Sequence, residues 1–230
     1  MTDRSHCLQM AKDTFNNLPL PRREAFIKAS LEEFSQRSYN DASVSRIVRV
    51  LAIAKGSVYQ YFEDKKSLYL YLKEQAETKK QSYIQQTLAE GYRDFWDLFQ
   101  KLYTAGSQFD LDYPLYSAFL FNCSQEKALP EISLSTQEQF AQGIRFFRQI
   151  LAEEQQQGRL NATLNPEAMA YIVMQVGRGM LDWLGYQYQV DFRKNIRQQN
   201  SVLGPNRDEL KQLVEEITHI LKSGMYYDSR

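Results

Sequence analysis

The scarcity of turn-forming residues constrains the fold of this 230-residue chain more than any other feature. Gly56 is the only glycine in the first ninety residues, and neither Asn-Gly nor Asp-Gly occurs anywhere in the sequence. The strands of a β-sheet protein need such residues in the turns between them. Apolar residues recur instead at helical spacing, as along Leu68, Leu72 and Ala76, and again across residues 210–221. The sequence therefore predicts an all-α protein.

The composition is that of an ordinary globular protein, with 43% hydrophobic and 24% charged residues. No uncharged apolar run approaches the roughly 20 residues that a membrane-spanning helix needs, and no apolar segment near the N-terminus indicates a secretory signal. The two cysteines, Cys7 and Cys123, cannot form a disulfide framework, and they favour a reducing compartment. We therefore expect a cytoplasmic protein with no membrane association.

Capping residues predict several helix boundaries in the second half of the chain. Residues 135–138, Ser-Thr-Gln-Glu, form a capping box that would begin a helix. Gly158 would end the same helix in the left-handed conformation, and Asn165 followed by Pro166 would begin the next one. Residues 189–206 are polar and are expected to form a long connection. These signals predict separate helices joined by short loops up to residue 189.

The most informative part of the sequence lies between residues 22 and 72, where three short helices are expected in quick succession. Their approximate ranges are 22–37, 43–51 and 54–61. Such a bundle contains a helix-turn-helix, here at about residues 43–62, which inserts its last helix into the major groove of DNA. Residues 1–80 also carry an excess of four positive charges, which fits a nucleic-acid partner.

The expected DNA contacts are small or polar residues on the last two of these helices and just after them. Lys55 places a cation at the N-terminus of the last helix, and Gly56 lets the backbone come close to DNA. Tyr59 and Tyr61 are two positions apart and cannot share a helix face, so at least one points outward. Lys65 lies in the first turn of the next helix, where backbone N–H groups favour a phosphate. The full set of expected contacts is Ser43, Ser45, Lys55, Gly56, Ser57, Tyr59, Gln60, Tyr61 and Lys65.

This part of the chain resembles the DNA-binding domain of the TetR family of bacterial transcriptional regulators. The resemblance rests mainly on residues 53–62, Ile-Ala-Lys-Gly-Ser-Val-Tyr-Gln-Tyr-Phe, followed three residues later by a lysine. It covers about the first quarter of the chain. The sequence departs from the family pattern at three positions. Ala52 stands at the turn where the family usually has glycine, Ala54 where serine is frequent, and Ser38 where glycine precedes an aromatic residue.

The resemblance implies a two-part subunit of about nine helices. Residues 1–20 would be an N-terminal extension, residues 21–66 the DNA-binding domain, and residues 67–230 a C-terminal domain that dimerises and often binds a small effector. It implies a homodimer that reads a palindromic double-stranded operator in the nucleoid and uses no cofactor. We expect a repressor that a small apolar or amphipathic ligand releases by changing the separation of the two recognition helices.

The C-terminal region supplies candidates for effector binding and for dimerisation. Its aromatic residues are dense enough for an apolar cavity with tyrosine hydroxyls as polar groups, although core packing accounts for any single one. The expected lining residues are Trp96, Phe99, Tyr103, Tyr116, Phe119 and Phe147. Apolar stripes on about residues 166–187 and 207–223 either form a four-helix bundle between two subunits or are buried within one subunit. The expected dimer contacts are Met169, Val173, Val176, Met180, Leu210, Val214, Ile217 and Leu221.

Two other functions are compatible with parts of the sequence. A DNA-bound dimer of this kind could recruit a protein partner through its C-terminal surface instead of sensing a small molecule. An all-α enzyme is disfavoured because no nucleophile, base or acidic pair has the spacing of a catalytic motif. His6 and His219 are too isolated in the sequence to form a metal site. We therefore expect neither catalytic residues nor a bound metal.

Overall fold

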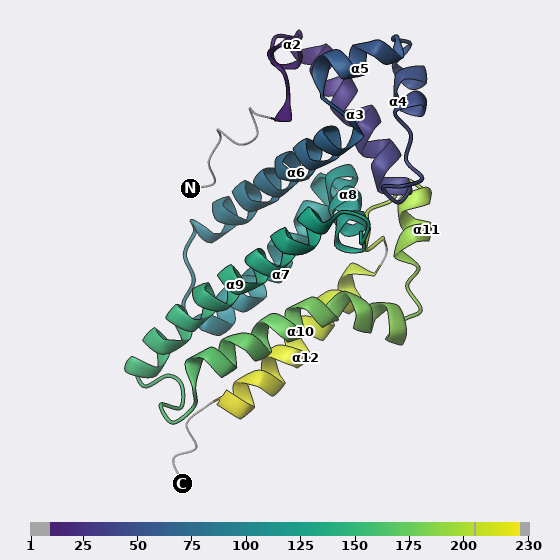
Figure 1. Cartoon of the computed structure of the whole chain (residues 1–230). Coiled ribbons are helices and arrows are strands. Elements are labelled where there is room, and N and C mark those ends of the chain that lie inside the picture. Colours follow the sequence, from purple (N-terminus) through teal and green to yellow (C-terminus); the bar gives the residue numbers. More distant parts are fainter. Residues whose placement is uncertain (1–9, 205, 226–230) are drawn as a thin grey trace. The chain divides into compact units, whose positions relative to one another are not determined.

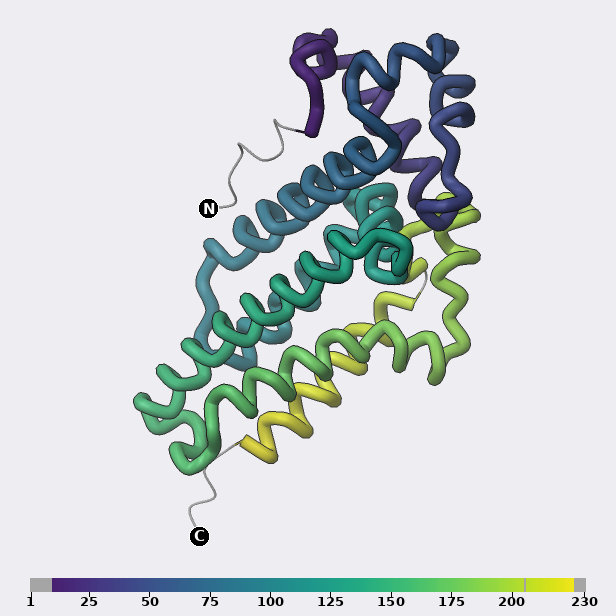
Figure 2. The backbone as a smooth tube through the Cα atoms, in the orientation of Figure 1, coloured from purple at the N-terminus to yellow at the C-terminus, as the bar shows by residue number. Residues whose placement is uncertain are grey.

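The computed structural model describes residues 10–204 and 206–225, and these residues form eleven helices and no strand (Figure 1, Figure 2). The all-α prediction is confirmed, while the expected count of about nine helices omits the short helices α2 and α11. The helices are α2 (Asp13–Asn16), α3 (Leu20–Gln36), α4 (Val44–Leu51), α5 (Lys55–Tyr61), α6 (Lys65–Leu88), α7 (Phe95–Asp112), α8 (Pro114–Ser124), α9 (Pro130–Gln156), α10 (Pro166–Gln187), α11 (Phe192–Arg197) and α12 (Arg207–Met225).

The helices form two compact units, and each unit is assembled from separate stretches of the chain. The first unit combines the residues up to Ser82 with Phe109–Leu129 and Arg193–Val202. The second unit combines Tyr83–Gln108, Pro130–Phe192 and the residues from Leu203 onward. These units describe packing, and the functional division of the chain at residue 66 stays a prediction.

Aromatic rings dominate the core of the first unit. Phe15 is fully buried, and its ring centroid lies 5.5 Å from that of Phe26 and 4.9 Å from that of Phe62. Phe34 and Phe119 pack on Tyr69, with centroid separations of 5.0 and 5.2 Å. Edge-to-face contacts of this kind add to the stabilisation that apolar burial provides. They hold α3 and the end of α5 against α6, and α3 against α8.

The core of the second unit lies among α7, α9, α10 and α12. Its buried side chains include Phe95 and Phe99 of α7, Leu151 of α9 and Leu184 of α10. Helices α9 and α10 are joined by a short connection and pack along their length (Figure 1). The apolar stripe of each of these helices therefore faces the interior of its own unit.

Some of the expected helix boundaries are confirmed and others are wrong. Asn165 caps α10, since its Oδ1 accepts hydrogen bonds from two backbone N–H groups of the first turn, and Gly158 follows α9 with a φ of +72°. The capping box at residues 135–138 is wrong, because α9 already begins at Pro130, a residue suited to the first turn. Residues 189–206 are not one open connection, because they contain α11, which buries Ile196.

The turn between α4 and α5 has the left-handed conformation that glycine usually provides. Ala52 ends α4 with φ 52° and ψ 38°. An L-residue in this conformation costs roughly 1–2 kcal/mol relative to the right-handed one. Ala54 occupies the N-cap position of α5 and supplies no side-chain hydrogen bond. The two departures from the family pattern therefore change the local energy of the turn while its backbone path is kept.

Candidate nucleic-acid interface

Helix α5 presents one face to the core and the opposite face to solvent. Val58 is buried and anchors the helix, whereas Lys55, Gly56 and Gln60 are exposed. Tyr59 is 44% exposed, which is high for so large a ring. The solvent face thus combines an ammonium, a carboxamide and a phenol within two helical turns. These groups can donate hydrogen bonds to base edges and to phosphate oxygens.

Open space surrounds Gly56. A Cβ atom built at this position meets no atom within 4 Å, so packing inside the chain does not require glycine here. The absence of a side chain leaves the backbone at the start of α5 accessible from outside. This is the property that the sequence predicts for close approach to DNA, and the contact itself stays a prediction.

The structure distinguishes the two tyrosines of α5. Tyr61 is half-buried, and its ring packs against those of Phe15 and Phe26 at centroid distances of 5.7 and 5.6 Å. Tyr59 projects into solvent without a ring contact among the described residues. Tyr59 is therefore the better placed of the two for a phosphate, while Tyr61 also contributes to the core.

Helix α4 begins within one residue of the predicted position, and the serine that precedes it does not cap it with its side chain. Ser43 has the extended backbone of an N-cap, and its hydroxyl makes no capping hydrogen bond. Its backbone N–H donates instead to Oε1 of Glu33 at 2.8 Å. The hydroxyls of Ser43 and Ser45, both half-buried, are not used in capping α4. Their contacts with DNA therefore stay a prediction.

Lys65, for which the sequence predicts a phosphate contact, is engaged within the chain in this structure. Its ammonium donates to the backbone carbonyls of Tyr39 at 2.8 Å and of Ala42 at 3.1 Å, with Asn40 more distant. It also lies 4.4 Å from the centroid of the Tyr39 ring, a cation–π distance. An ammonium has three N–H donors, so these carbonyls occupy them. Contact with a phosphate would require one of these bonds to be exchanged.

Residues 11–16, outside the predicted DNA-binding domain, hold the C-terminal end of α5. The ammonium of Lys12 donates to the backbone carbonyl of Tyr59 at 2.7 Å. The backbone N–H of Lys12 donates to the backbone carbonyl of Tyr61 at 2.9 Å. The hydroxyl of Thr14 donates to the carbonyl of Gln60. The last carbonyls of a helix have no partner within the helix. Three consecutive carbonyls of α5 are satisfied by this segment, which the sequence analysis assigned to an extension.

A buried carboxylate connects α3 to α4. Glu33 is 7% exposed and accepts hydrogen bonds from Nη1 of Arg37 at 2.9 Å and from Nε of Arg46 at 2.8 Å. It also accepts the backbone N–H of Ser43 at the start of α4. The hydrogen bond and charge of Glu33 raise the pKa of the Arg46 guanidinium. No local pattern in the sequence indicates the contacts of Glu33 with Arg46 and Ser43, because the turn between α3 and α4 brings these residues together.

The described residues offer neither a metal centre nor a membrane span. No group of three or more His, Cys, Asp or Glu side chains among them could hold a metal ion. No described helix combines the length and apolar character needed to cross a bilayer. His6 and Cys7 lie outside the described residues. Cys123 is buried, and burial raises the pKa of its thiol to about 12.

Residues 26–72, which contain α4, α5 and most of α3, match the sequence model of the bacterial regulatory proteins of the tetR family. A crystal structure of a TetR family transcriptional regulator from Chloroflexus aurantiacus J-10-FL superposes with a TM-score of 0.73 at 25% identity, covering 95% of this chain and 100% of that one. The N-terminal region of this chain thus matches the TetR-family DNA-binding domain, and the chain as a whole has a TetR-like fold. The family fold thus accounts for the helix-turn-helix and for the helices that follow it.

Other TetR-like structures share the fold at lower identity. A TetR-like transcriptional regulator from Rhodococcus sp. RHA1 has a TM-score of 0.63 at 14% identity, covering 90% of this chain and 100% of that one. A ketosteroid transcriptional regulator of Mycobacterium tuberculosis has a TM-score of 0.59 at 13% identity, covering 92% of this chain and 98% of that one. No curated protein sequence matches this chain.

The six aromatic residues expected to line one cavity of the C-terminal region do not line a common cavity. Trp96, Phe99 and Phe147 are buried in the core of the second unit. Phe119 is buried in the first unit, where it packs on Tyr69. Tyr116, also in the first unit, lies beneath the ammonium of Lys79. Among the described residues, Tyr103 lines a cavity of the second unit and Tyr116 lines a different cavity in the first unit, so the predicted pocket is wrong as a set. The physical reason is that the buried aromatic side chains pack against neighbouring side chains in the cores and leave no space between them for a ligand.

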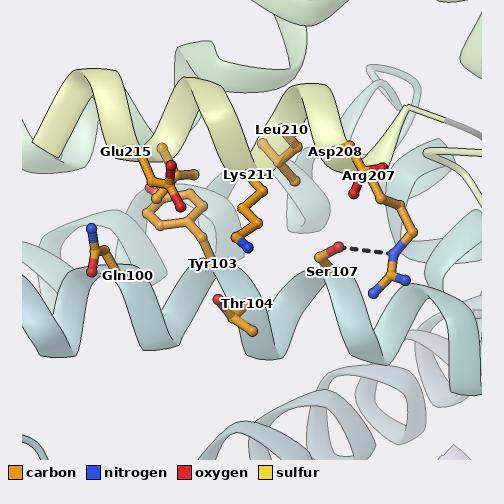
Figure 3. Close-up of a pocket in the computed structure, with 10 residues that line it drawn as sticks. Gln100, Tyr103, Thr104, Ser107, Arg207, Asp208, Leu210, Lys211 and Glu215 are labelled. Carbon is orange, nitrogen blue, oxygen red and sulfur yellow. Dashed lines mark hydrogen bonds between the residues drawn. The ribbon is translucent and has the colours of Figure 1, made fainter.

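The cavity beside Tyr103 lies between α7 and α12 and has a volume of about 330 Å³ (Figure 3). Its lining residues are Gln100, Tyr103, Thr104, Ser107, Arg207, Asp208, Leu210, Lys211, Val214 and Glu215. Burial raises the pKa of Tyr103, whose hydroxyl packs against the backbone of Gly177 on α10. The cavity is therefore more polar than the sequence predicts.

The residues expected to form the dimer contact belong largely to the core of a single chain. Met169, Val173, Met180, Leu210 and Val214 are buried in the second unit, and Val176, Ile217 and Leu221 are half-buried against it. The alternative in which both stripes face their own subunit is thus the one that the structure supports. The opposite faces of the same helices expose other large apolar residues. They are Tyr171, Ile172, Trp183 and Tyr186 of α10 and Ile220 of α12.

Proposed function

We propose that this protein is a transcriptional regulator that binds a palindromic DNA operator as a homodimer, and that it represses transcription until an amphipathic ligand releases it. The observation that carries the proposal is the solvent face of α5, where Lys55, Tyr59 and Gln60 project from a helix anchored by Val58. A helix with this exposure in a helix-turn-helix is suited to the major groove. TetR regulators bind their operators as dimers, which fits the exposed apolar residues of α10 and α12.

A library of duplex DNA with a random central segment tests this function. We expect the full-length protein to enrich a palindromic site whose half-sites are about one helical turn, or a multiple of it, apart. Lys55→Gln is expected to weaken binding about 10-fold at fixed salt and to relax base preference, because an exposed cation that reads a base is lost. The matched control is Lys211→Gln, which replaces an exposed lysine of α12 and should bind DNA normally. Failure to enrich any sequence would refute the function.

The cavity between α7 and α12 supports a ligand that has an anionic group and an apolar body. Arg207 donates from Nε to Ser107 and from Nη2 to Gln108, both at 3.2 Å, and is held at one end of the cavity. Lys211 lies between that end and Tyr103 (Figure 3). Among the described residues, the Lys211 ammonium has no hydrogen-bond or ion-pair partner. A cation without a partner favours an anionic ligand group at the centre of the cavity.

The same cavity offers apolar contacts for the rest of such a ligand. The side chains of Leu210 and Val214 and the ring of Tyr103 line it, while Asp208 and Glu215 lie toward its two ends (Figure 3). A carboxylate placed at Lys211 would thus avoid both acidic side chains. This concave surface of mixed polar and apolar groups favours a small ligand over the alternative in which the C-terminal region recruits a protein partner.

Decanoate and the uncharged decanol are suitable probes of the cavity. We expect decanoate to bind the wild-type protein in calorimetric titrations and to weaken its binding to the enriched duplex. Lys211→Gln should lower the decanoate affinity about 10-fold, since a charge-assisted hydrogen bond is lost, and leave decanol unaffected. Lys55→Gln, which lies in the first unit, is the matched control and should bind decanoate normally. Equal decanoate affinity of the Lys211 variant and the wild type would remove this cavity as the effector site.

A further inference from the structure

The loop between α3 and α4, residues 37–43, is held by side chains from a distant part of the sequence. Two of them, Asn122 and Glu126, come from the end of α8 and the turn after it, 85 or more positions away. We infer that Asn122 and Glu126 are positioning residues for DNA binding, because they fix the loop that leads into the helix-turn-helix. The inference rests on the proposed function.

Asn122 caps the C-terminal end of α3. Its side chain is 5% exposed, and Nδ2 donates to the carbonyl of Phe34 at 2.7 Å and to that of Arg37 at 2.6 Å. Helix α3 ends at Gln36, so these are carbonyls for which the helix itself offers few donors. A buried carbonyl without a hydrogen-bond donor costs free energy. Both bonds therefore stabilise the position of this end of α3 on α8.

Glu126 holds the middle of the loop. One carboxylate oxygen accepts the backbone N–H of Tyr39 at 2.8 Å. The other accepts the backbone N–H groups of Lys127 and Ala128 at 3.0 and 2.7 Å. The carboxylate is thus fixed in the turn that follows α8 and is not a free surface charge. Its position sets the position of Tyr39.

The loop is held from its other side by the helices next to it in sequence. Lys65, at the start of α6, donates to the carbonyls of Tyr39 and Ala42, as described above. The ring of Tyr39 packs on that of Tyr69 at a centroid distance of 5.3 Å. At the end of the loop, Glu33 accepts the N–H of Ser43, the residue that begins α4. Nearly every residue of the loop is therefore tied to a helix.

These contacts extend the DNA-binding unit beyond the part that resembles the family domain. Residues 109–129 lie outside the matched residues 26–72, yet they belong to the same compact unit. Helix α3 packs along α8 within that unit. Because α4 follows the loop directly, a shift of the loop relative to α8 moves α4, and with it α5. Asn122 and Glu126 therefore set the orientation in which α5 is presented.

Three substitutions in the full-length protein test this inference with the duplex enriched by the wild-type protein. Asn122→Asp keeps the size of the side chain but turns a carboxylate toward two carbonyl oxygens. Glu126→Ala removes the acceptor for Tyr39, and Glu126→Gln keeps an oxygen that can accept. The neighbouring Gln125→Ala is the matched control, because the Gln125 side chain is exposed and bonds, among the described residues, only to Ser124, and the substitution keeps the backbone N–H that donates to Asn122. Affinity for the enriched duplex and for an unrelated duplex is measured at the same salt concentration.

We expect Asn122→Asp and Glu126→Ala to lower affinity for the enriched duplex by about 3-fold to 30-fold, the range seen for substitutions that act on a site through packed neighbours. Affinity for the unrelated duplex should change less than 2-fold, because phosphate contacts tolerate a misplaced helix. Glu126→Gln should restore most of the loss. Amide exchange at Tyr39 should accelerate in Glu126→Ala but not in Gln125→Ala.

The outcomes separate the inference from the proposed function. If the wild-type protein enriches a site and both Asn122→Asp and Glu126→Ala bind it normally, the inference is overturned while the function stands. An equal loss on both duplexes also overturns it, since that pattern indicates a smaller folded fraction. If Asn122→Asp does not fold, the partly exposed Glu126 decides the question alone. A wild-type protein that enriches no duplex overturns the proposed function and the inference with it.

Discussion

An Ile220→Asp variant is expected to sediment as a monomer and to bind the operator about 100-fold more weakly than the wild-type protein. Ile220 is 67% exposed on α12, so the change leaves the core of its own chain intact. In the proposed dimer it would place an unpaired carboxylate in an apolar contact, which costs several kcal/mol. Loss of the second half-site then removes the gain from two linked binding events, typically about 100-fold or more. Analytical ultracentrifugation and DNA titration measure the two effects.

Leu134→Asp is the matched control for this dimer prediction. Leu134 is 60% exposed on α9, in the same compact unit, and the substitution is chemically similar. The control is expected to remain dimeric and to bind DNA normally. A dimeric Ile220→Asp protein with full operator affinity would place the subunit contact away from this face of α12. Substitution of Ile217 or Leu221 is less informative, because both pack against the core of their own chain.

A Phe15→Ala variant is expected to lose about 3–5 kcal/mol of unfolding free energy, the usual effect of removing a buried phenylalanine. Phe15 is fully buried and packs against the rings of Phe26, Phe62 and Tyr71, with centroids 4.9–5.6 Å away. The segment that carries it also holds the C-terminal carbonyls of α5, so operator affinity should fall as well. Chemical denaturation and DNA titration at a temperature where the variant is folded test the two parts separately.

Leu20→Ala is the control for the Phe15 prediction. Leu20 is more than half exposed at the start of α3, so its truncation should change stability by less than about 0.5 kcal/mol. If Phe15→Ala loses less than about 1 kcal/mol, residues 11–16 do not contribute to the core in the way described. Normal operator affinity in a folded Phe15→Ala protein would show that this segment does not support α5.

The helices of the DNA-binding region could be predicted from the sequence because their signals are local. The expected ranges 22–37, 43–51 and 54–61 differ by at most two residues from α3, α4 and α5. Short connections and the alternation of apolar and polar positions fix such boundaries without reference to distant residues. The outward position of Lys55 and the inward position of Val58 follow from the same helical period.

The differences at Lys65 and Met180 arise where the folded chain brings in a partner that is distant in sequence, whereas the difference at Ser135 has a local cause. Lys65 has the pattern of a phosphate-binding cation, but the loop after α3 supplies carbonyls to its ammonium. Ser135 has a capping pattern inside a helix that Pro130 has already begun. Met180 lies in a stripe that any partner helix could cover, and its own chain covers it. Periodicity identifies an apolar face but does not identify what covers that face.

The first compact unit is completed late in synthesis. Its last stretch, Arg193–Val202, is tied to the middle one by the backbone N–H of Val202, which donates at 2.9 Å to the buried carboxylate of Asp110. The ribosome adds roughly 5–20 residues per second, so about 7 to 28 s separate the end of the helix-turn-helix from Val202. During that interval the nascent chain carries a recognition helix whose supporting unit is incomplete. The first unit can therefore pack fully only after Arg193–Val202 has been synthesised.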